Sequence, residues 1–212
     1  MQKYELTDET RAEYGVTLHR IRALVDIVRY SVKAGDLGGW VEKESNLDQD
    51  GEAWVSGDAQ VSDNARVSGD ALVSDNARVS GNAWVYGDAW VSGNARVSGN
   101  ARVYDNARVS GDALVYDNAR VSGNAWVYGN ARVCKTAHVL TVGPIGRRDD
   151  TTTFFRAKFS AGFSISVCCG CFRGTLDEFR AKVKQTYGDN KHGTAYQLAA
   201  DLAEAQIELG EE

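Results

Sequence analysis

The sequence predicts a mainly β protein, in which a parallel β-helix of six-residue repeats precedes a small α+β domain. Valine recurs at every sixth position from Val55 to Val139, and an alanine stands two residues before each valine, from Ala53 to Ala137. The unit is Ala-x-Val-[Ser/Tyr]-[Gly/Asp]-[Asp/Asn], and fifteen units follow one another. A repeat this regular determines the architecture, so it is interpreted before any other feature.

Each unit has the composition of a very short strand followed by a tight corner. The alanine and the valine are two positions apart, so they share one face of a strand, and β-branched valine suits a buried pleated surface. The Gly/Asp and Asp/Asn positions tolerate positive φ and form turns. Because such a strand cannot fold alone, we expect coils stacked about 4.8 Å apart, with every strand paired above and below.

Three units make a triangular coil of 18 residues, so fifteen units predict five coils in a prism about 24 Å tall. A right-handed helix and a β-sandwich remain competing architectures. The outward x residues then stack in three columns. These columns are Trp54, Leu72, Trp90, Arg108, Trp126; Gln60, Arg78, Arg96, Leu114, Arg132; and Arg66, Trp84, Arg102, Arg120, His138.

The first column predicts an interface. Trp54, Leu72, Trp90 and Trp126 would form a large apolar stripe for an exposed surface. Triangular prisms can pack side by side, so we expect self-association into a dimer or trimer. A binding face for another macromolecule, or simple tolerance of exposed indoles on a stiff sheet, are the alternatives.

The third column mixes arginine with aromatic residues and predicts a possible anion or nucleotide site. Its members would be Arg66, Arg102 and Arg120, with Tyr86 and Tyr104 close by. Bidentate arginine and ring stacking suit such ligands. The competing interpretation is a solvated ladder in which each arginine pairs with a turn aspartate on an adjacent coil, and it is the one that we favour.

Catalytic features are sparse. His138 is the only histidine in the repeats, at an x position where an outward side chain is expected, and the strict period leaves no room for a projecting catalytic loop. Cys168 and Cys171 have Cys-x-x-Cys spacing, but no second pair exists to complete a zinc site. We therefore interpret the cysteines as small core residues, and predict no catalytic residue, metal or cofactor.

The flanks predict caps. Residues 1–39 would cover the start of a β-helix spanning 40–142, with Val41 and Leu47 in two irregular units and a two-residue insertion around 48–51. Residues 145–212 would form an α+β domain that caps the last coil, dimerises or binds a partner. Its predicted elements are a hairpin of 152–159 and 163–171, a helix from the Thr175 capping box to Gly188, and a helix from Thr194 to Leu209 anchored by Leu198, Leu202 and Leu209.

The flanking motifs resemble those of a known group. The segments VTLHRIRAL (16–24), KAGDLGGWVEKESNL (33–47), PIGRRDDTTTFF (144–155) and CGCFRGTLDEF (169–179), around Ala-x-Val repeats, are similar to uncharacterised bacterial and prophage-encoded hexapeptide-repeat proteins. Such proteins are often labelled acyltransferases or polymer-forming proteins. The resemblance implies a left-handed β-helix and a phage-associated setting, but carries over no catalytic residue, since fold does not determine function.

These features favour a non-enzymatic interaction protein, a self-associating β-helix that binds a host macromolecule, with inhibition of that macromolecule as one possible outcome. The alternatives are a sequestering binder of an anionic nucleotide-type molecule, and a hexapeptide-type acyltransferase using His138. A net charge of −5 gives no reason to expect nucleic acid. The absence of a long apolar run and the clustered cysteines predict no membrane contact and the cytoplasm of a bacterial host.

Overall fold

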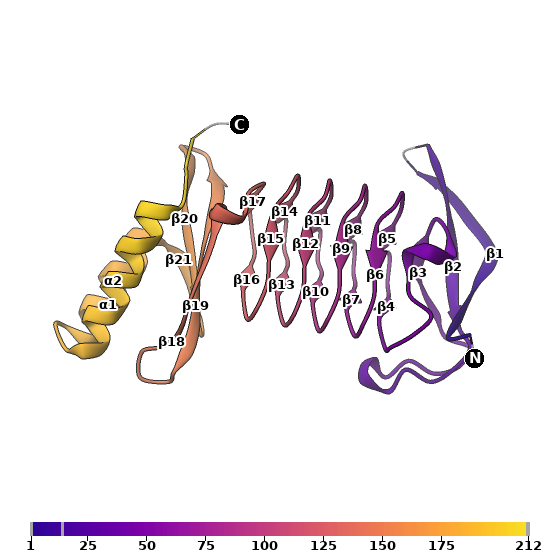
Figure 1. Ribbon diagram of the computed structural model, residues 1–212, viewed down its shortest axis with the longest axis horizontal. Helices are drawn as coiled ribbons and strands as arrows, with labels where there is room; N and C mark the ends of the chain where they lie inside the picture. Colours follow the sequence, from indigo (N-terminus) through magenta and orange to yellow (C-terminus); the bar gives the residue numbers. More distant parts are fainter. Residues whose placement is uncertain (1, 14, 211–212) are drawn as a thin grey trace.

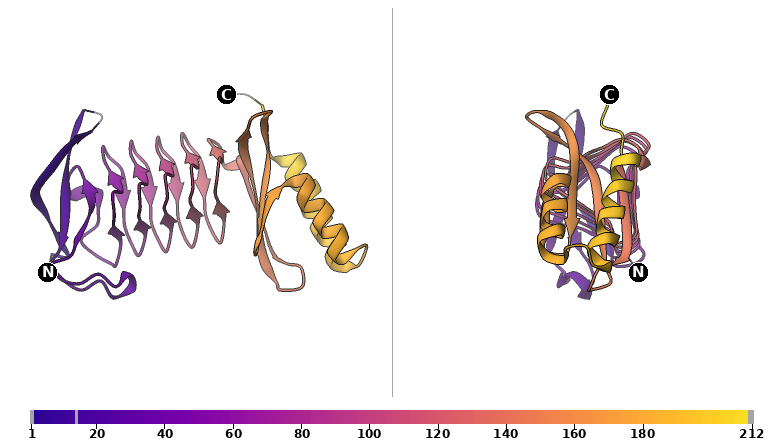
Figure 2. Two further views of the ribbon diagram at one scale, coloured as in Figure 1. Left: turned by 180° about the vertical axis from the view of Figure 1, so that it is seen from behind. Right: turned by 90° about the vertical axis from the view of Figure 1, so that its left-hand side faces the viewer.

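The computed structural model describes residues 2–13 and 15–210 and shows an elongated parallel β-solenoid between two end structures (Figures 1 and 2). The solenoid is the predicted β-helix of hexapeptide repeats. An N-terminal hairpin covers one end, and a sheet backed by two helices covers the other. No helix within the described residues is long and apolar enough to cross a membrane.

The coil consists of two-residue strands, each formed by an x residue and its valine. They make three parallel sheets, which we call the first, second and third faces after the columns they carry. The first face is β4 (Trp54–Val55), β7 (Leu72–Val73), β10 (Trp90–Val91), β13 (Arg108–Val109) and β16 (Trp126–Val127). The second is β5 (Gln60–Val61), β8 (Arg78–Val79), β11 (Arg96–Val97), β14 (Leu114–Val115) and β17 (Arg132–Val133). The third is β6 (Arg66–Val67), β9 (Trp84–Val85), β12 (Arg102–Val103) and β15 (Arg120–Val121).

The interior of the coil is the predicted column of alanine and valine. Every repeat alanine from Ala53 to Ala131 and every repeat valine from Val55 to Val133 is at most 1% exposed. Consecutive coils pair valine with valine at a spacing of 18 residues, as in Val91 with Val109. Each short strand therefore obtains its hydrogen bonds from the coils above and below.

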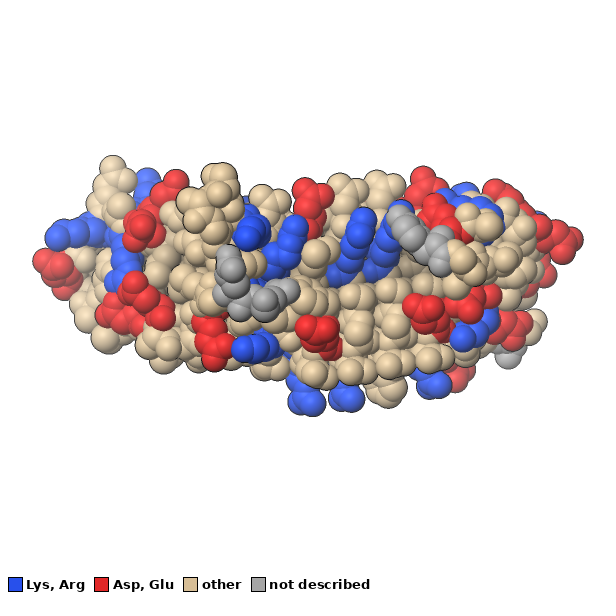
Figure 3. Space-filling model, turned by 90° about the horizontal axis from the view of Figure 1, so that it is seen from above, with Lys and Arg blue, Asp and Glu red and all other residues tan. Residues whose placement is uncertain are grey.

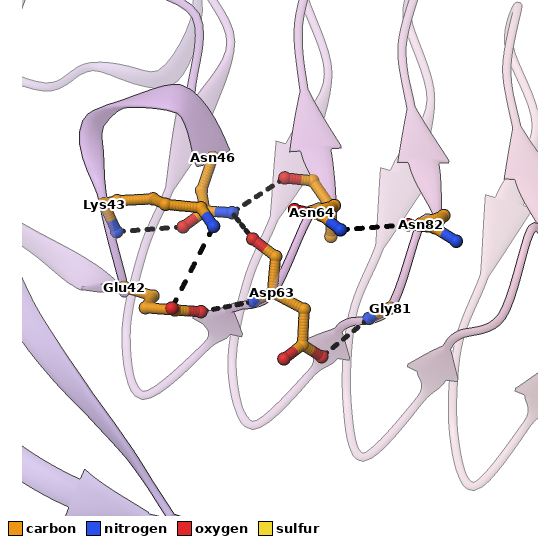
Figure 4. Close-up of polar contacts among 8 residues, drawn as sticks. Glu42, Lys43, Asn46, Asp63, Asn64, Gly81 and Asn82 are labelled. Carbon is orange, nitrogen blue, oxygen red and sulfur yellow. Dashed lines mark hydrogen bonds and ion pairs between the residues drawn. The ribbon is translucent and has the colours of Figure 1, made fainter.

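The corners depend on the fifth position of the unit, which holds only glycine or aspartate from residue 57 to residue 129. All of these residues have φ between 54° and 70°, the left-handed region in which side chains other than Gly, Asn and Asp are rare. Where the residue is aspartate, its carboxylate can accept the amide of the glycine one coil further on. The Gly81 N–H donates to Asp63 Oδ2 at 2.8 Å (Figure 4). The Gly93 N–H donates to Asp75 Oδ2 at 2.9 Å.

Asparagine side chains form a second ladder at the following position. Asn64 donates to Asn82 at 3.2 Å, Asn82 to Asn100 at 3.2 Å, and Asn100 to Asn118 at 3.3 Å. Asn46 begins this column and donates instead to the carbonyl oxygens of Asp63 and Ala65 (Figure 4). The corners are thus linked along the coil axis by side chains as well as by the backbone.

The N-terminal end confirms the two irregular units and the insertion. Val41 pairs with Val61 and Leu47 bridges to Val67, both 20 residues apart, whereas Val55 pairs with Val73 at the regular 18. Ahead of them, β3 (Leu37–Val41) pairs with β2 (Val16–Ala23), which pairs with β1 (Tyr4–Glu13), so the hairpin extends the second face. Short 3₁₀ helices span Val28–Tyr30 and Glu44–Asn46.

Lys3 closes the backbone of the first coil. Its side chain is buried, and Nζ donates to the carbonyl oxygens of Asp50, Gly51 and Ala53 at 3.4, 3.4 and 2.9 Å. These oxygens lie where no earlier coil can supply donors, so the ammonium group satisfies part of an otherwise open end.

The C-terminal sheet caps the last coil. It contains β18 (Val139–Ile145), β19 (Asp150–Phe159), β20 (Gly162–Cys169) and β21 (Phe172–Thr175), all antiparallel. Phe155 and Ala157 of β19 extend the coil's core, and the Trp126 N–H donates to Thr153 Oγ1 at 3.0 Å. The sequence left three roles open for residues 145–212, and capping of the last coil is the one that the fold shows.

The fifteenth unit leaves the coil. His138 ends a 3₁₀ helix, Thr136–His138, and Val139 begins β18, where it pairs with Phe155 rather than with the preceding rung of the third face. The regular stacking thus ends at β17, because β19 crosses the open end at this point.

The outer face of the C-terminal sheet packs against α1 (Leu176–Tyr187) and α2 (Lys191–Gln206). The Thr175 capping box is confirmed, and α1 ends before Gly188 as expected. The start of α2 lies three residues before the predicted Thr194, because the Asn190 side chain caps it by accepting the amides of His192 and Gly193.

The predicted leucine anchors of the second helix are wrong. Leu198, Leu202 and Leu209 are all exposed, and the buried side of α2 is formed by Tyr196, Ala199, Ala200 and Ala203. Small alanines let the helix lie close to the sheet, and periodicity alone could not distinguish this stripe from the leucine stripe.

The stacked corners predict unequal costs for one substitution at two glycines. A Cβ on Gly111 (φ +69°) would lie 2.8 Å from Gly129 N, whereas a Cβ on Gly123 (φ +64°) would meet no atom within 4 Å. Gly123→Ala should therefore lower the free energy of unfolding by about 1–2 kcal/mol through backbone strain alone. Gly111→Ala should cost at least about 1 kcal/mol more in urea denaturation. Equal costs would show that the corners are not closely stacked.

The buried Lys3 predicts a pH dependence. Burial lowers its pKa to about 8, from the 10.5 of a free lysine. Between these values the unfolded chain binds more protons than the folded one, so the free energy of unfolding attributable to Lys3 rises with pH. Urea denaturation at pH 7.5, 8.5 and 9.5 should show a steeper rise for the wild type than for Lys3→Met. Parallel pH profiles would contradict this assignment.

Candidate interaction surfaces

The first face is less exposed than its column predicts. Trp54, expected on the surface, is only 1% exposed and belongs to the core. The backbone of β3 lies on the indole, since a Cβ on Gly38 would be 2.6 Å from Trp54 Cζ2. Leu72 is half-buried beside it. The N-terminal cap therefore removes one end of the predicted stripe from solvent.

The rest of the first face is a ladder of alternating indoles and guanidinium groups. The Arg108 Cζ lies 5.6 Å from the Trp90 ring centroid and 5.7 Å from that of Trp126. The Cζ of Arg173, from β21, lies 4.0 Å from the Trp126 ring centroid. Trp90 is 41% exposed, and its Nε1 donates to Ser74 Oγ at 3.1 Å, which fixes the ring orientation. The face thus combines apolar area with cations placed on aromatic rings.

The third face brings together the residues predicted for anion binding. The Arg102 Cζ lies 5.4 Å from the Trp84 ring centroid, and Arg66 and Arg120 occupy neighbouring rungs. Tyr86 and Tyr104 stack with centroids 5.0 Å apart and planes 3° from parallel. All three arginines are exposed.

The predicted arginine–aspartate ladder is absent from this face. Within residues 2–13 and 15–210, none of Arg66, Arg102 and Arg120 forms an ion pair. The turn aspartates Asp63, Asp75 and Asp105 point along the coil axis instead and accept glycine amides. The arginines are left available to a partner.

The stacked tyrosines disfavour a nucleotide site. For a base to insert between two rings, the rings must be separated by about twice the ordinary stacking distance. Tyr86 and Tyr104 already contact each other directly, so no base fits between them. The surface around them is a flat sheet. Its aromatic and arginine composition is the one enriched at protein interfaces.

The second face contains a basic recess that the column analysis did not single out. Arg78, Arg96 and Arg132 stand on its floor, and Lys158 of β19 overhangs one end. Figure 3 looks onto this side and shows Lys and Arg side chains in a row between the two ends of the molecule. Three arginines among five x residues were the signal in the sequence, but the overhanging hairpins could not be anticipated from it.

His138 does not occupy the exposed position expected of it. It is 3% exposed, and its Nδ1 lies 3.4 Å from the Cys134 amide and 3.6 Å from Cys134 Sγ. Burial, and then the nearby Arg156 and Lys135 charges, lower the pKa of His138. A side chain enclosed in this way cannot reach a substrate that binds from solvent, which weighs against a general base.

The cysteines divide by exposure. Cys134 and Cys168 are buried, Cys169 is half-buried with Sγ 3.1 Å from Thr152 Oγ1, and Cys171 is exposed. Burial raises the pKa of Cys168 to about 11. No group of three or more potential metal-ligating side chains occurs in the described part of the chain. Cys168 is a core residue, whereas the interpretation of the cysteines as small core residues is wrong for the exposed Cys171.

Comparison with known families supports the repeat architecture. Segments of the chain match the family model described as the YdcK beta solenoid repeat, in overlapping units at residues 59–75, 71–87, 77–93, 89–103, 101–116 and 113–129. The matches lie within the regular coils and do not include either end structure. No curated protein matches the chain.

The reactivity of the thiols tests the burial of Cys134 and Cys168 and the exposure of Cys171. In folded protein at pH 8, a thiol reagent such as Ellman's reagent should modify Cys171 rapidly, while Cys134 and Cys168 react only as fast as the protein unfolds. Cys171→Ser should remove the fastest phase, and denaturant should expose all four thiols of the wild type. Rapid modification of three or more thiols without denaturant would contradict the burial of Cys134 and Cys168.

Proposed function

We propose that this chain is a non-catalytic interaction scaffold that associates with a second copy through its first face and binds another macromolecule through its third. The observation that carries the proposal is the state of the outward arginines. On the first and third faces, Arg102 and Arg108 lie on indole rings, and none of Arg66, Arg102, Arg108 and Arg120 forms an ion pair with a carboxylate of the described residues. Exposed Trp, Tyr and Arg side chains are the residues that contribute most to protein interfaces.

The first face suits self-association better than the third. A two-fold dimer places the same surface on both sides of the interface. On the third face this would bring Arg66, Arg102 and Arg120 against their own copies, and like charges in contact are unfavourable. The first face carries Arg108 and Arg173, both stacked on Trp126, beside the exposed Trp90.

The third face suits a partner with acidic groups. Its three arginines surround Trp84 and the stacked pair of Tyr86 and Tyr104, and they would supply both charge and apolar area. Arginine forms bidentate hydrogen bonds with carboxylates, and its guanidinium group loses little hydration on burial. The rigid sheet beneath holds these side chains at fixed spacing, which reduces the entropy lost on binding.

Two tryptophans of equal exposure test the assignment of the faces. Trp90 is 41% and Trp84 is 42% exposed, on the first and third faces. The wild type should sediment as a dimer at micromolar concentration, and Trp90→Ser should weaken the dimer by about 2 kcal/mol, roughly 30-fold. Trp84→Ser should leave it unchanged. A wild type that remains monomeric at 100 μM, or dissociation by Trp84→Ser alone, would refute self-association through the first face.

A further inference from the structure

The second face is the floor of a recess with an overhang at each end. At the N-terminal side, Glu13 at the end of β1 forms an ion pair with Arg78 at 3.7 Å, and Val16 at the start of β2 lines a hollow with Gln60 and Arg96. The β19–β20 hairpin rises at the other end (Figure 1). Two hollows lie between the hairpins, and Arg96 and Ser98 line both of them.

The larger hollow, of about 650 Å³, has a mixed lining. Its cations are Arg96, Arg132 and Lys158, and its apolar walls are Leu114, Tyr116 and Phe163. Arg96 makes no ion pair or side-chain hydrogen bond with the described residues. Among the described residues, Arg132 donates only to carbonyl oxygens, those of Asp112 at 3.0 Å and Ala131 at 2.9 Å, so no described carboxylate neutralises its charge.

The spacing of these cations defines the length of a ligand. Arg96, Leu114 and Arg132 occupy consecutive rungs of the second face. Two rungs span about 10 Å, and an extended peptide covers this distance in about three residues. Two acidic side chains could therefore contact Arg96 and Arg132 while an apolar residue between them lies on Leu114 and Tyr116.

We propose that this recess binds an extended acidic segment of another protein, with carboxylates on Arg96, Arg132 and Lys158 and an apolar side chain between them. Charge complementarity is the reason: the hollow is lined by three cations that have no carboxylate partner among residues 2–13 and 15–210. This site lies on a different face from both surfaces proposed above and does not depend on either of them.

The ring contacts favour a peptide over a nucleic acid. Single-stranded nucleic acid is held largely by stacking of bases on open aromatic rings. Cations already lie on the Phe163 ring, with Arg156 Cζ 3.5 Å and Lys158 Nζ 4.4 Å from its centroid. Glu13 and Asp63 also border the neighbouring hollow, and they would repel a long polyanion but not a short peptide that ends before them.

Fluorescence anisotropy with two labelled probes tests the proposal. The probes are the peptide Glu-Glu-Leu-Leu-Glu-Glu and a six-nucleotide oligothymidylate, each titrated with the whole protein at low ionic strength. The peptide should bind saturably and weaken as salt is added. Arg96→Gln should weaken it about 10-fold, as expected for loss of a charge-assisted hydrogen bond. Arg147→Gln, which changes an exposed arginine between β18 and β19 that forms no ion pair with the described residues and belongs to none of the proposed surfaces, should change the affinity less than twofold.

Three results would overturn the proposal. They are the absence of saturable peptide binding, an equal loss of affinity in Arg96→Gln and Arg147→Gln, and tighter binding of the oligothymidylate than of the peptide. Arg96 and Arg147 are both exposed, so neither substitution should disturb the fold, and circular dichroism of the variants checks this.

Discussion

The structure depends on the corner of the hexapeptide unit, where one residue must adopt positive φ directly beneath its equivalent in the next coil. Glycine meets both conditions, and aspartate meets them where the next coil offers a glycine amide, as Gly81 does for Asp63. With the corners restricted in this way, each alanine and valine is directed inward and each x residue outward. The inner sequence is therefore uniform, and the differences between units are confined to the surface.

A solenoid must also close its two ends, and this requirement explains most of the chain outside the repeats. The N-terminal hairpin and Lys3 cover the first coil, while β19 brings Phe155, Ala157 and the Thr153 hydroxyl onto the last. Both caps also project beyond the coil as hairpins. Closing the core thus creates the recess on the second face, so the end structures contribute to the surface as well as to stability.

Local features of the sequence were sufficient to predict the coil, the irregular first units and the α1 capping box, because each follows from spacing or turn chemistry. The predicted arginine–aspartate ladder failed because the turn aspartates accept glycine amides along the coil instead. The main failures in predicted burial concern residues next to a cap. Trp54 and His138 have the spacing of outward residues, but segments distant in sequence bury them. The same is true of α2, where the choice between the leucine and alanine stripes depends on the sheet beneath. Burial by a distant segment leaves no periodic signal.

The central proposal, an interaction scaffold that pairs through its first face, is tested most directly by hydroxyl-radical footprinting at increasing protein concentration. Trp90 and Trp84 have nearly equal exposure in the single chain, so they act as matched internal probes. We expect the oxidation rate of Trp90 to fall as the concentration rises, while that of Trp84 stays constant. Constant rates for both residues, or protection of Trp84 alone, would contradict the proposal.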